Sequence, residues 1–188
     1  MSAPLTPDEL ETLGQVAQRS VQQWVLERDY WLPDPHDYPP SVRAPGAAFV
    51  TLRRHGQLRG CIGTLAATQS LVRCVADRAR AAAADDPRFT PVQAGELADL
   101  TVEVSVLSEP EELPANDYDE LLRRVQPGVD GLIVEDPSHR ATLLPSVWDD
   151  IASAEEFVAA LWRKAGLQPR AWPRRLRMQR YRAQHWPA

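Results

Sequence analysis

Apolar residues recur along the chain at two spacings, one typical of helices and one typical of strands. From residue 7 to about residue 27 they recur every three or four positions, which predicts a helix with one buried face. Thr6, Pro7 and Glu9 support this prediction, because they supply an N-cap, a first-turn proline and a capping-box acid. The same spacing predicts three further helices: one that Thr68 caps and Pro87 stops, a short one ending near Leu122, and one from Ser153 to Ala165.

Alternation of apolar and polar residues predicts strands. The clearest case is LTVEVSVLS, residues 100–108, which buries one face only. Two hairpins are expected, with turns at His55–Gly56 and at Asp136–Ser138. In the C-terminal tail the apolar parity reverses, so we expect a β-bulge near Gln179. The proline-rich segment 33–45 is expected to be an extended, stiff loop.

Length and composition are those of one soluble globular domain. The 188 residues are 44% hydrophobic and 25% charged, enough for a substantial core. Hairpins combined with separate helices predict an α+β fold with a mainly antiparallel sheet and flanking helices. No apolar run approaches the roughly 18 residues of a membrane span, and the N-terminus has no signal-peptide pattern.

The two cysteines are too few for a disulfide framework, which favours reduced thiols and a cytoplasmic location. The chain has no CxxC motif, no His/Cys ligand spacing and no glycine-rich phosphate loop. We therefore expect no cofactor and no metal. Cys74 lies among apolar residues of a predicted helix, so a structural role is expected for it.

Positive charge is concentrated near the C-terminus. Of the 21 Lys and Arg residues, eight lie from Arg163 onward, where no acidic residue occurs, although the formal net charge is −5. Such asymmetry is found in nucleic-acid-binding tails. The tail also interleaves large apolar residues with its arginines, and the whole chain is acidic, so an ordered strand with solvated arginines is the better interpretation.

The segment LRGCIG, residues 58–63, holds the clearest candidate chemistry. Strand alternation places Arg59 and Cys61 on one face, where the cation would favour the reactive thiolate. Gly60 and Gly63 would let a ligand or another backbone approach closely. The helix predicted to open at Thr68 could add its free N–H groups. Equally, Cys61 could be a small core residue.

The motifs LRGCIG and DPRF, followed in order by VEVSVL, DGLIV, LLPSV and KAGL, resemble the AMMECR domain family. Prokaryotic members of that family are called AmmeMemoRadiSam system protein A. The resemblance runs from about Leu5 to Trp186, so we expect one domain over residues 5–186. It implies a larger and a smaller lobe sharing one cleft, and an association with Memo-like and radical SAM proteins.

Two functions stay open on these grounds. In the first, the chain is a cytoplasmic enzyme or enzyme component, with Cys61 as nucleophile and Glu103 as general base. In the second, it is a non-catalytic adaptor in which Cys61 is structural. The first predicts an exposed Cys61, and the second predicts a buried one beside an exposed apolar patch. The ligand-binding residues expected of the enzyme are Arg59, Gly60, Gly63, Arg88 and Ser105.

Overall fold

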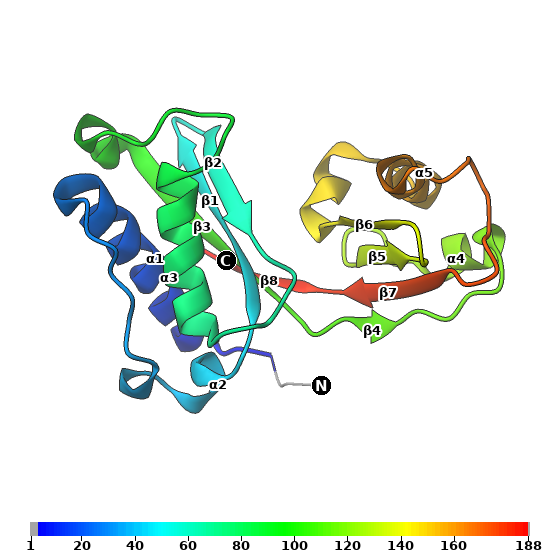
Figure 1. Cartoon of the computed structure of the whole chain (residues 1–188), viewed down its shortest axis with the longest axis horizontal. Helices are drawn as coiled ribbons and strands as arrows, with labels where there is room; N and C mark the ends of the chain where they lie inside the picture. The colour runs from blue at the N-terminus through cyan, green and yellow to red at the C-terminus, as the bar shows by residue number, and fades with distance from the viewer. Residues whose placement is uncertain (1–3, 188) are drawn as a thin grey trace. The chain divides into compact units, whose positions relative to one another are not determined.

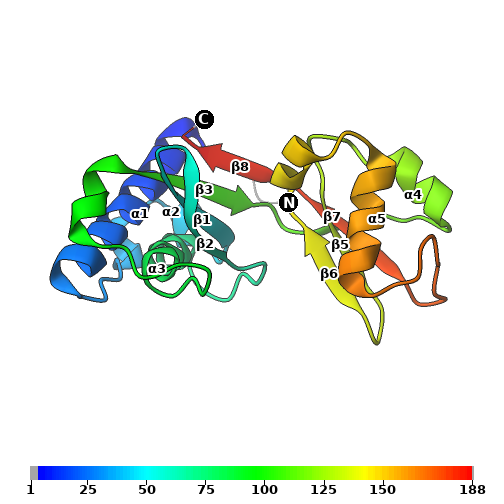
Figure 2. The same cartoon turned by 90° about the horizontal axis from the view of Figure 1, so that it is seen from above.

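The structure is a computed structural model that describes residues 4–187, and its chain forms two compact units. The first unit contains the chain up to Ser108 and the C-terminal stretch from Gln184, and the second contains Glu109–Ala183. Each unit has its own antiparallel sheet and helices (Figure 1, Figure 2). Each also has its own hydrophobic core. The predicted α+β class is confirmed. Within residues 4–187, no helix is both long and apolar enough to cross a bilayer.

The first unit has a four-stranded sheet with strand order β2-β1-β3-β8. Helices α1 and α3 pack against each other and against one face of this sheet (Figure 1). Its elements are α1 (Pro7–Glu27), η1 (Pro35–Asp37), α2 (Pro40–Arg43), β1 (Ala47–Arg54), β2 (Gln57–Gly63), α3 (Leu71–Ala84), η2 (Ala94–Asp99), β3 (Leu100–Leu107) and β8 (Ala183–Trp186).

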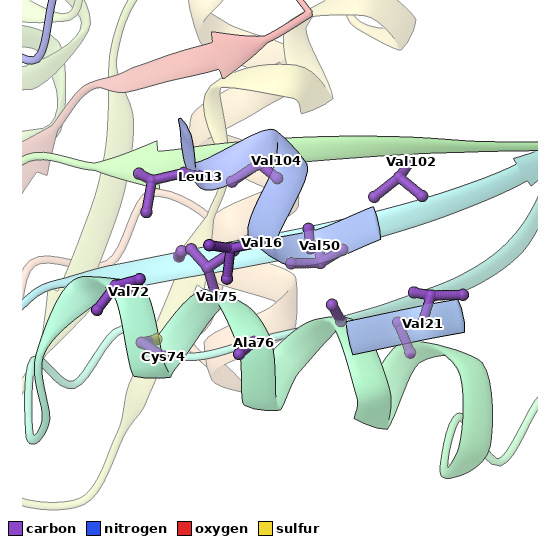
Figure 3. Close-up of a cluster of buried hydrophobic side chains, with 14 of the residues drawn as sticks. Leu13, Val16, Val21, Val50, Val72, Cys74, Val75, Ala76, Val102 and Val104 are labelled. Carbon is purple, nitrogen blue, oxygen red and sulfur yellow. The ribbon is translucent and has the colours of Figure 1, made fainter. Parts of the chain in front are cut away.

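The core of this unit lies between the two helices and the inner face of the sheet. Figure 3 shows side chains from α1, α3, β1 and β3 meeting there; those labelled include Leu13, Val16, Val50, Val75 and Val104. Cys74 also lies in this core with no exposed surface, and burial raises the pKa of its thiol. The expected structural role of Cys74 agrees with this placement.

The opposite face of the same sheet carries polar side chains. Because side chains alternate along a strand, the burial of Val50 and Val104 directs Thr51, Glu103 and Ser105 away from α1 and α3. These three residues are half-buried rather than buried. The sheet therefore has one helix-covered face and one helix-free face within the first unit, and the second is where polar chemistry is possible.

The helix starts follow the local sequence signals with one exception. The capping box of Thr6 and Glu9 is formed at the start of α1. The prediction that Thr68 caps α3 was wrong, because Ser70 is the N-cap. The start of α3 is held by a distant segment, since the Leu71 N–H donates to the Ala44 carbonyl at 2.9 Å.

The proline-rich segment is not simply extended, which corrects the prediction. It forms the short helical turns η1 and α2, whose first residues are Pro35 and Pro40. Proline suits that position, since its fixed φ matches the helix and the N–H it lacks would be unpaired there. The Asp34 side chain caps η1 by accepting from the His36 N–H at 3.0 Å.

The second unit has a four-stranded sheet with strand order β4-β7-β5-β6. Its core is aromatic: Trp148 stacks on Phe157 with ring centroids 3.9 Å apart, and Tyr118 meets the fully buried Trp162 edge to face. Its elements are β4 (Glu111–Glu112), α4 (Tyr118–Arg124), β5 (Gly131–Glu135), β6 (Arg140–Leu143), η3 (Pro145–Asp150), α5 (Ala154–Ala165) and β7 (Arg177–Tyr181).

The expected bulge near Gln179 was wrong, because strand β7 pairs with β5 without a register shift. The parity reversal falls within this regular strand: Met178 and Tyr181 are both buried, and alternation places them on opposite faces of the sheet. After Arg182 the chain enters β8 of the other sheet. Side-chain contacts anchor β8: the Gln184 amide exchanges hydrogen bonds with the Leu5 backbone, and the Trp186 indole packs over Gly14.

The arginines of β7 are paired with acidic residues of the neighbouring strand. Arg177 binds Glu112 and Arg180 binds Glu111, each at 2.6 Å. These pairs agree with an ordered strand, the interpretation preferred over a nucleic-acid-binding tail.

Helix α3 and strand β2 approach most closely at Gly60. A Cβ at this position would lie 2.2 Å from the Ala82 carbonyl oxygen, a backbone atom that cannot rotate away. We therefore predict that Gly60→Ala lowers the free energy of unfolding by about 2–4 kcal/mol, through overpacking. Urea denaturation monitored by circular dichroism measures this change.

The matched control is Gly95→Ala, because a Cβ there meets nothing within 4 Å. This variant should be neutral or more stable by up to about 1 kcal/mol. Equal stabilities of the two variants would contradict the close approach of α3 at Gly60.

Candidate functional site

Cys61 lies on the helix-free face of the first sheet, at its β2 edge. It is half-buried and stands directly opposite Thr51 of β1. The Thr51 hydroxyl donates a hydrogen bond to the Cys61 sulfur, with an Oγ1–Sγ distance of 3.3 Å. The thiol is therefore accessible and already has a polar partner.

The backbone of Cys61 is held from outside the sheet by the DPRF motif. Its N–H donates to Asp86 Oδ2 at 2.8 Å, and its carbonyl accepts from Arg88 Nη2 at 3.3 Å. These two groups would otherwise be unpaired on an edge strand. Because the Cys61 N–H and C=O groups point out of the sheet, Cys61 and Thr51 form a non-hydrogen-bonded pair. In such a pair the cross-strand side chains lie closest.

Asp86 and Arg88 also bind each other. Asp86 is only 3% exposed, and its carboxylate accepts from the Arg88 N–H, Nε and Nη2 at 2.7–3.1 Å. The guanidinium, together with these backbone donors, holds the pKa of Asp86 well below its usual range despite burial. We expected Arg88 either to bind an anion or to brace the helix end. These contacts agree with bracing.

The end of α3 that meets the site is the C-terminal one. Asp86 lies two residues after the last helical residue, Ala84, and contacts Cys61. The helix has 14 residues, so its N-terminus is about 20 Å away along its axis. The expectation that helix N–H groups join the thiol was therefore wrong.

Arg59 makes its contacts with Glu96. Its Nε and Nη2 bind the two carboxylate oxygens of Glu96 at 2.8 and 3.0 Å, and its Nη1 donates to the Thr90 carbonyl. The bidentate guanidinium lowers the pKa of Glu96 to about 2. A β-bulge in β2 explains this placement, because Arg59 has no partner in the pairing of β2 with β1. The regular alternation that would put Arg59 and Cys61 on the same face of the sheet is broken at this point.

The two glycines of the motif lie beside different neighbours. The space next to Gly60 is taken by the α3 backbone at Ala82, the second of the two alternatives considered for it. At Gly63 a Cβ would lie 2.1 Å from the Phe49 ring, so the missing side chain lets this ring lie over the strand. Phe49 is half-buried and places an apolar surface two residues from Cys61.

Glu103 shares a cross-strand row with Cys61. Thr51 pairs with Cys61 on one side and with Glu103 on the other, so the two candidate catalytic residues are two strand spacings, about 10 Å, apart. Glu103 Oε1 accepts from Arg53 Nε at 2.9 Å. Thr51 lies between the thiol and this carboxylate in the row.

Ser105 lies one row further along and contacts His185 of β8, with 3.0 Å between Oγ and Nδ1. Sequence reasoning gave no role to His185, Thr51 or Arg53, which only strand register brings to the site. It named Asp86 only as one of two possible partners through which Arg88 could brace the helix end.

Within residues 4–187 no group of three or more His, Cys, Asp or Glu side chains could hold a metal ion. The carboxylates nearest Cys61 bind arginines instead.

Comparison with known proteins agrees with the motifs. A family model described as AMMECR1 matches residues 14–186. A protein of Methanothermobacter thermautotrophicus is 43% identical over 176 residues, which cover 89% of this chain and 87% of that protein. A protein of Thermococcus onnurineus is 40% identical over 172 residues, covering 86% of this chain and 81% of that one. The crystal structure of an uncharacterized protein, PH0010 from Pyrococcus horikoshii, has a TM-score of 0.85 at 34% identity and covers 96% of this chain and 92% of its own.

The Asp86 carboxylate should stabilise the fold in a pH-dependent way. Its folded pKa lies below its unfolded value of about 3.9, so the stabilisation is complete above that pH and is lost as pH falls through the folded pKa. We predict that Asp86→Asn lowers the free energy of unfolding at pH 7 by about 2–3 kcal/mol, and that the loss shrinks below pH ~4. Urea denaturation at pH 7 and pH 3 tests both parts.

Asp85→Asn is the control, since its carboxylate is exposed and binds only Arg80. Its effect should stay within about 1 kcal/mol at either pH. A loss for Asp86→Asn that does not depend on pH would contradict the assigned role of its charge.

Proposed function

The chain belongs to the AMMECR1 family, and from that premise we propose that it is a thiol-dependent enzyme, or the thiol-bearing component of one. One observation carries the proposal: Cys61 is only half-buried on the helix-free face, while its backbone is held by Asp86 and Arg88. A reactive group needs exposure to substrate and a fixed position, and Cys61 has both. A residue that only filled the core would need neither.

The chemistry that suits this arrangement is nucleophilic attack by the Cys61 sulfur on an electrophilic carbon of a small or peptidyl substrate. The thiol loses its proton to solvent and the thiolate forms the new S–C bond. The bond from that carbon to the leaving group breaks, and the leaving group takes the electron pair. The Thr51 hydroxyl, which donates to the sulfur, orients the nucleophile and stabilises its negative charge.

We assign the role of general base to Glu103, which would lie on the side of the bound substrate away from Cys61. It lies in the Cys61–Thr51–Glu103 row, and one of its oxygens accepts from Arg53. Across the roughly 10 Å between the two residues, a substrate or a water molecule would be the group that Glu103 deprotonates. Ser105, one row away, is assigned to substrate binding.

The alternative function, a non-catalytic adaptor, predicts a buried Cys61. The half-buried thiol favours the enzyme. From the family resemblance we also propose that the protein acts in the cytoplasm together with Memo-like and radical SAM proteins. Affinity purification of the tagged chain from its native cells tests this part, and recovery of neither partner type would count against it.

We predict that iodoacetamide labels Cys61 in the folded chain and leaves Cys74 unlabelled, since Cys74 is fully buried. Mass spectrometry of the digested protein separates the two sites. Thr51→Val should slow labelling of Cys61 about three- to tenfold, because the sulfur loses its hydroxyl donor.

Thr101→Val is the matched control, because Thr101 lies on the same face of β3 and its hydroxyl donates to the Arg53 carbonyl. It should leave the labelling rate unchanged. The enzyme proposal fails if Cys61 is labelled only after denaturation, and the adaptor then becomes the better assignment.

A further inference from the structure

In the part of the chain that the structure describes, four arginines around the Cys61 strand are each paired with a carboxylate. Arg88, which donates to the Cys61 carbonyl, binds Asp86 at 2.7 Å. Arg53, on the same face of β1 as Thr51, binds Glu103 at 2.9 Å. These two pairs flank the thiol, one at the sheet edge and one across the sheet.

The same holds at the bulge next to Cys61. Arg59 binds both oxygens of Glu96, and Arg54 lies 3.4 Å from Glu96 and 3.8 Å from Asp99. The cluster thus matches arginines and carboxylates one to one. Its summed charge is zero, so it offers no net attraction to an ionised group of either sign.

Two of these arginines, Arg59 and Arg88, use most of their donor groups on protein oxygens. Arg59 uses Nε, Nη1 and Nη2 on protein oxygens, and Arg88 uses Nε and Nη2. A phosphate or carboxylate that bound Arg59 or Arg88 through Nε and Nη2 would have to displace Glu96 or Asp86 from charge-assisted bonds of 2.7–3.0 Å. Displacing Asp86 would also release the Cys61 N–H, so anion binding would disturb the nucleophile itself.

Apolar rings lie close to the motif on both sides. The Phe49 ring lies over Gly63, and the Phe89 ring lies 5.8 Å from the Arg59 guanidinium and 5.6 Å from that of Arg88. Both rings are half-buried and so present some apolar surface to solvent. These rings suit a substrate with uncharged, partly apolar groups next to the reacting carbon.

We infer that the substrate of Cys61 is uncharged at its reacting group, an acyl carbon of an ester, amide or lactam, and that phosphorylated or carboxylated electrophiles are disfavoured. This inference rests on the proposed function, because it assigns a substrate class to the same thiol. In the reaction the sulfur bonds to the carbonyl carbon, and the bond to the leaving oxygen or nitrogen breaks. The leaving atom keeps the electron pair and takes a proton from water, while the acyl group remains on Cys61 as a thioester.

Two alkylating reagents of similar size test the inference: uncharged iodoacetamide and anionic iodoacetate. The measurement is the ratio of their rates at Cys61, followed by mass spectrometry at low salt, with a cysteine in an unstructured peptide as reference. Taking the ratio cancels the thiolate fraction, which both rates share. We expect an iodoacetate-to-iodoacetamide ratio no higher than that of the peptide, and no protection by inorganic phosphate.

Glu103→Gln leaves the positive charge of Arg53 unmatched on the Cys61 face. This variant should raise the iodoacetate-to-iodoacetamide ratio about three- to tenfold, the effect of one unit charge several ångströms from the reagent. Glu27→Gln makes the same change in net charge at the exposed end of α1, on the helix side of the sheet, and should not change the ratio.

The outcomes separate the inference from the function on which it rests. If the unsubstituted protein has a higher iodoacetate-to-iodoacetamide ratio than the peptide, or if phosphate protects Cys61 from labelling, the substrate is not of the uncharged class. Cys61 would still be reactive in that case. An unchanged ratio in Glu103→Gln overturns the argument from neutralised charge. If neither reagent labels Cys61 in the folded chain, the proposed function fails, and the inference fails with it.

Discussion

The candidate site depends on how the backbone groups at the edge of strand β2 are paired. An edge strand leaves N–H and C=O groups unpaired, and at Cys61 the Asp86 carboxylate and the Arg88 guanidinium take the place of a neighbouring strand. Because the two side chains also bind each other, the arrangement is electrically neutral. It fixes the backbone of Cys61 while leaving the side chain free on the helix-free face.

Strand register then decides which side chains accompany the thiol. With the Cys61 backbone groups directed outward, its side chain lies close to Thr51, and the row continues to Glu103. The helix-covered face supplies rigidity, since Val50 and Leu52 are fully buried and Gly60 admits the α3 backbone. The polar row therefore lies on a platform held firmly from behind.

Electrostatics gives this platform its chemical character. The arginines that sequence reasoning offered as ligand-binding residues, Arg59 and Arg88, both have carboxylate partners within the chain. Only the contacts reveal this, because an arginine in a sequence carries no mark of whether its charge is matched. Neutral surroundings with apolar rings suit a thiol that reacts with uncharged carbonyl groups. The reaction then depends mainly on the thiol itself and on the neighbouring Thr51 hydroxyl.

The sequence by itself determined the α+β class, the capping box of α1, both hairpins, α5 and the family, because each depends on residues close together in the chain or on ordered motifs. Only the tertiary structure decided where α3 starts, that the tail changes sheets and that a bulge turns Arg59 towards Glu96. It also decided that Asp86 and Thr51 are the partners of Cys61. These features depend on hydrogen bonds between segments tens of residues apart, and local periodicity carries no information about which distant groups will satisfy an unpaired donor.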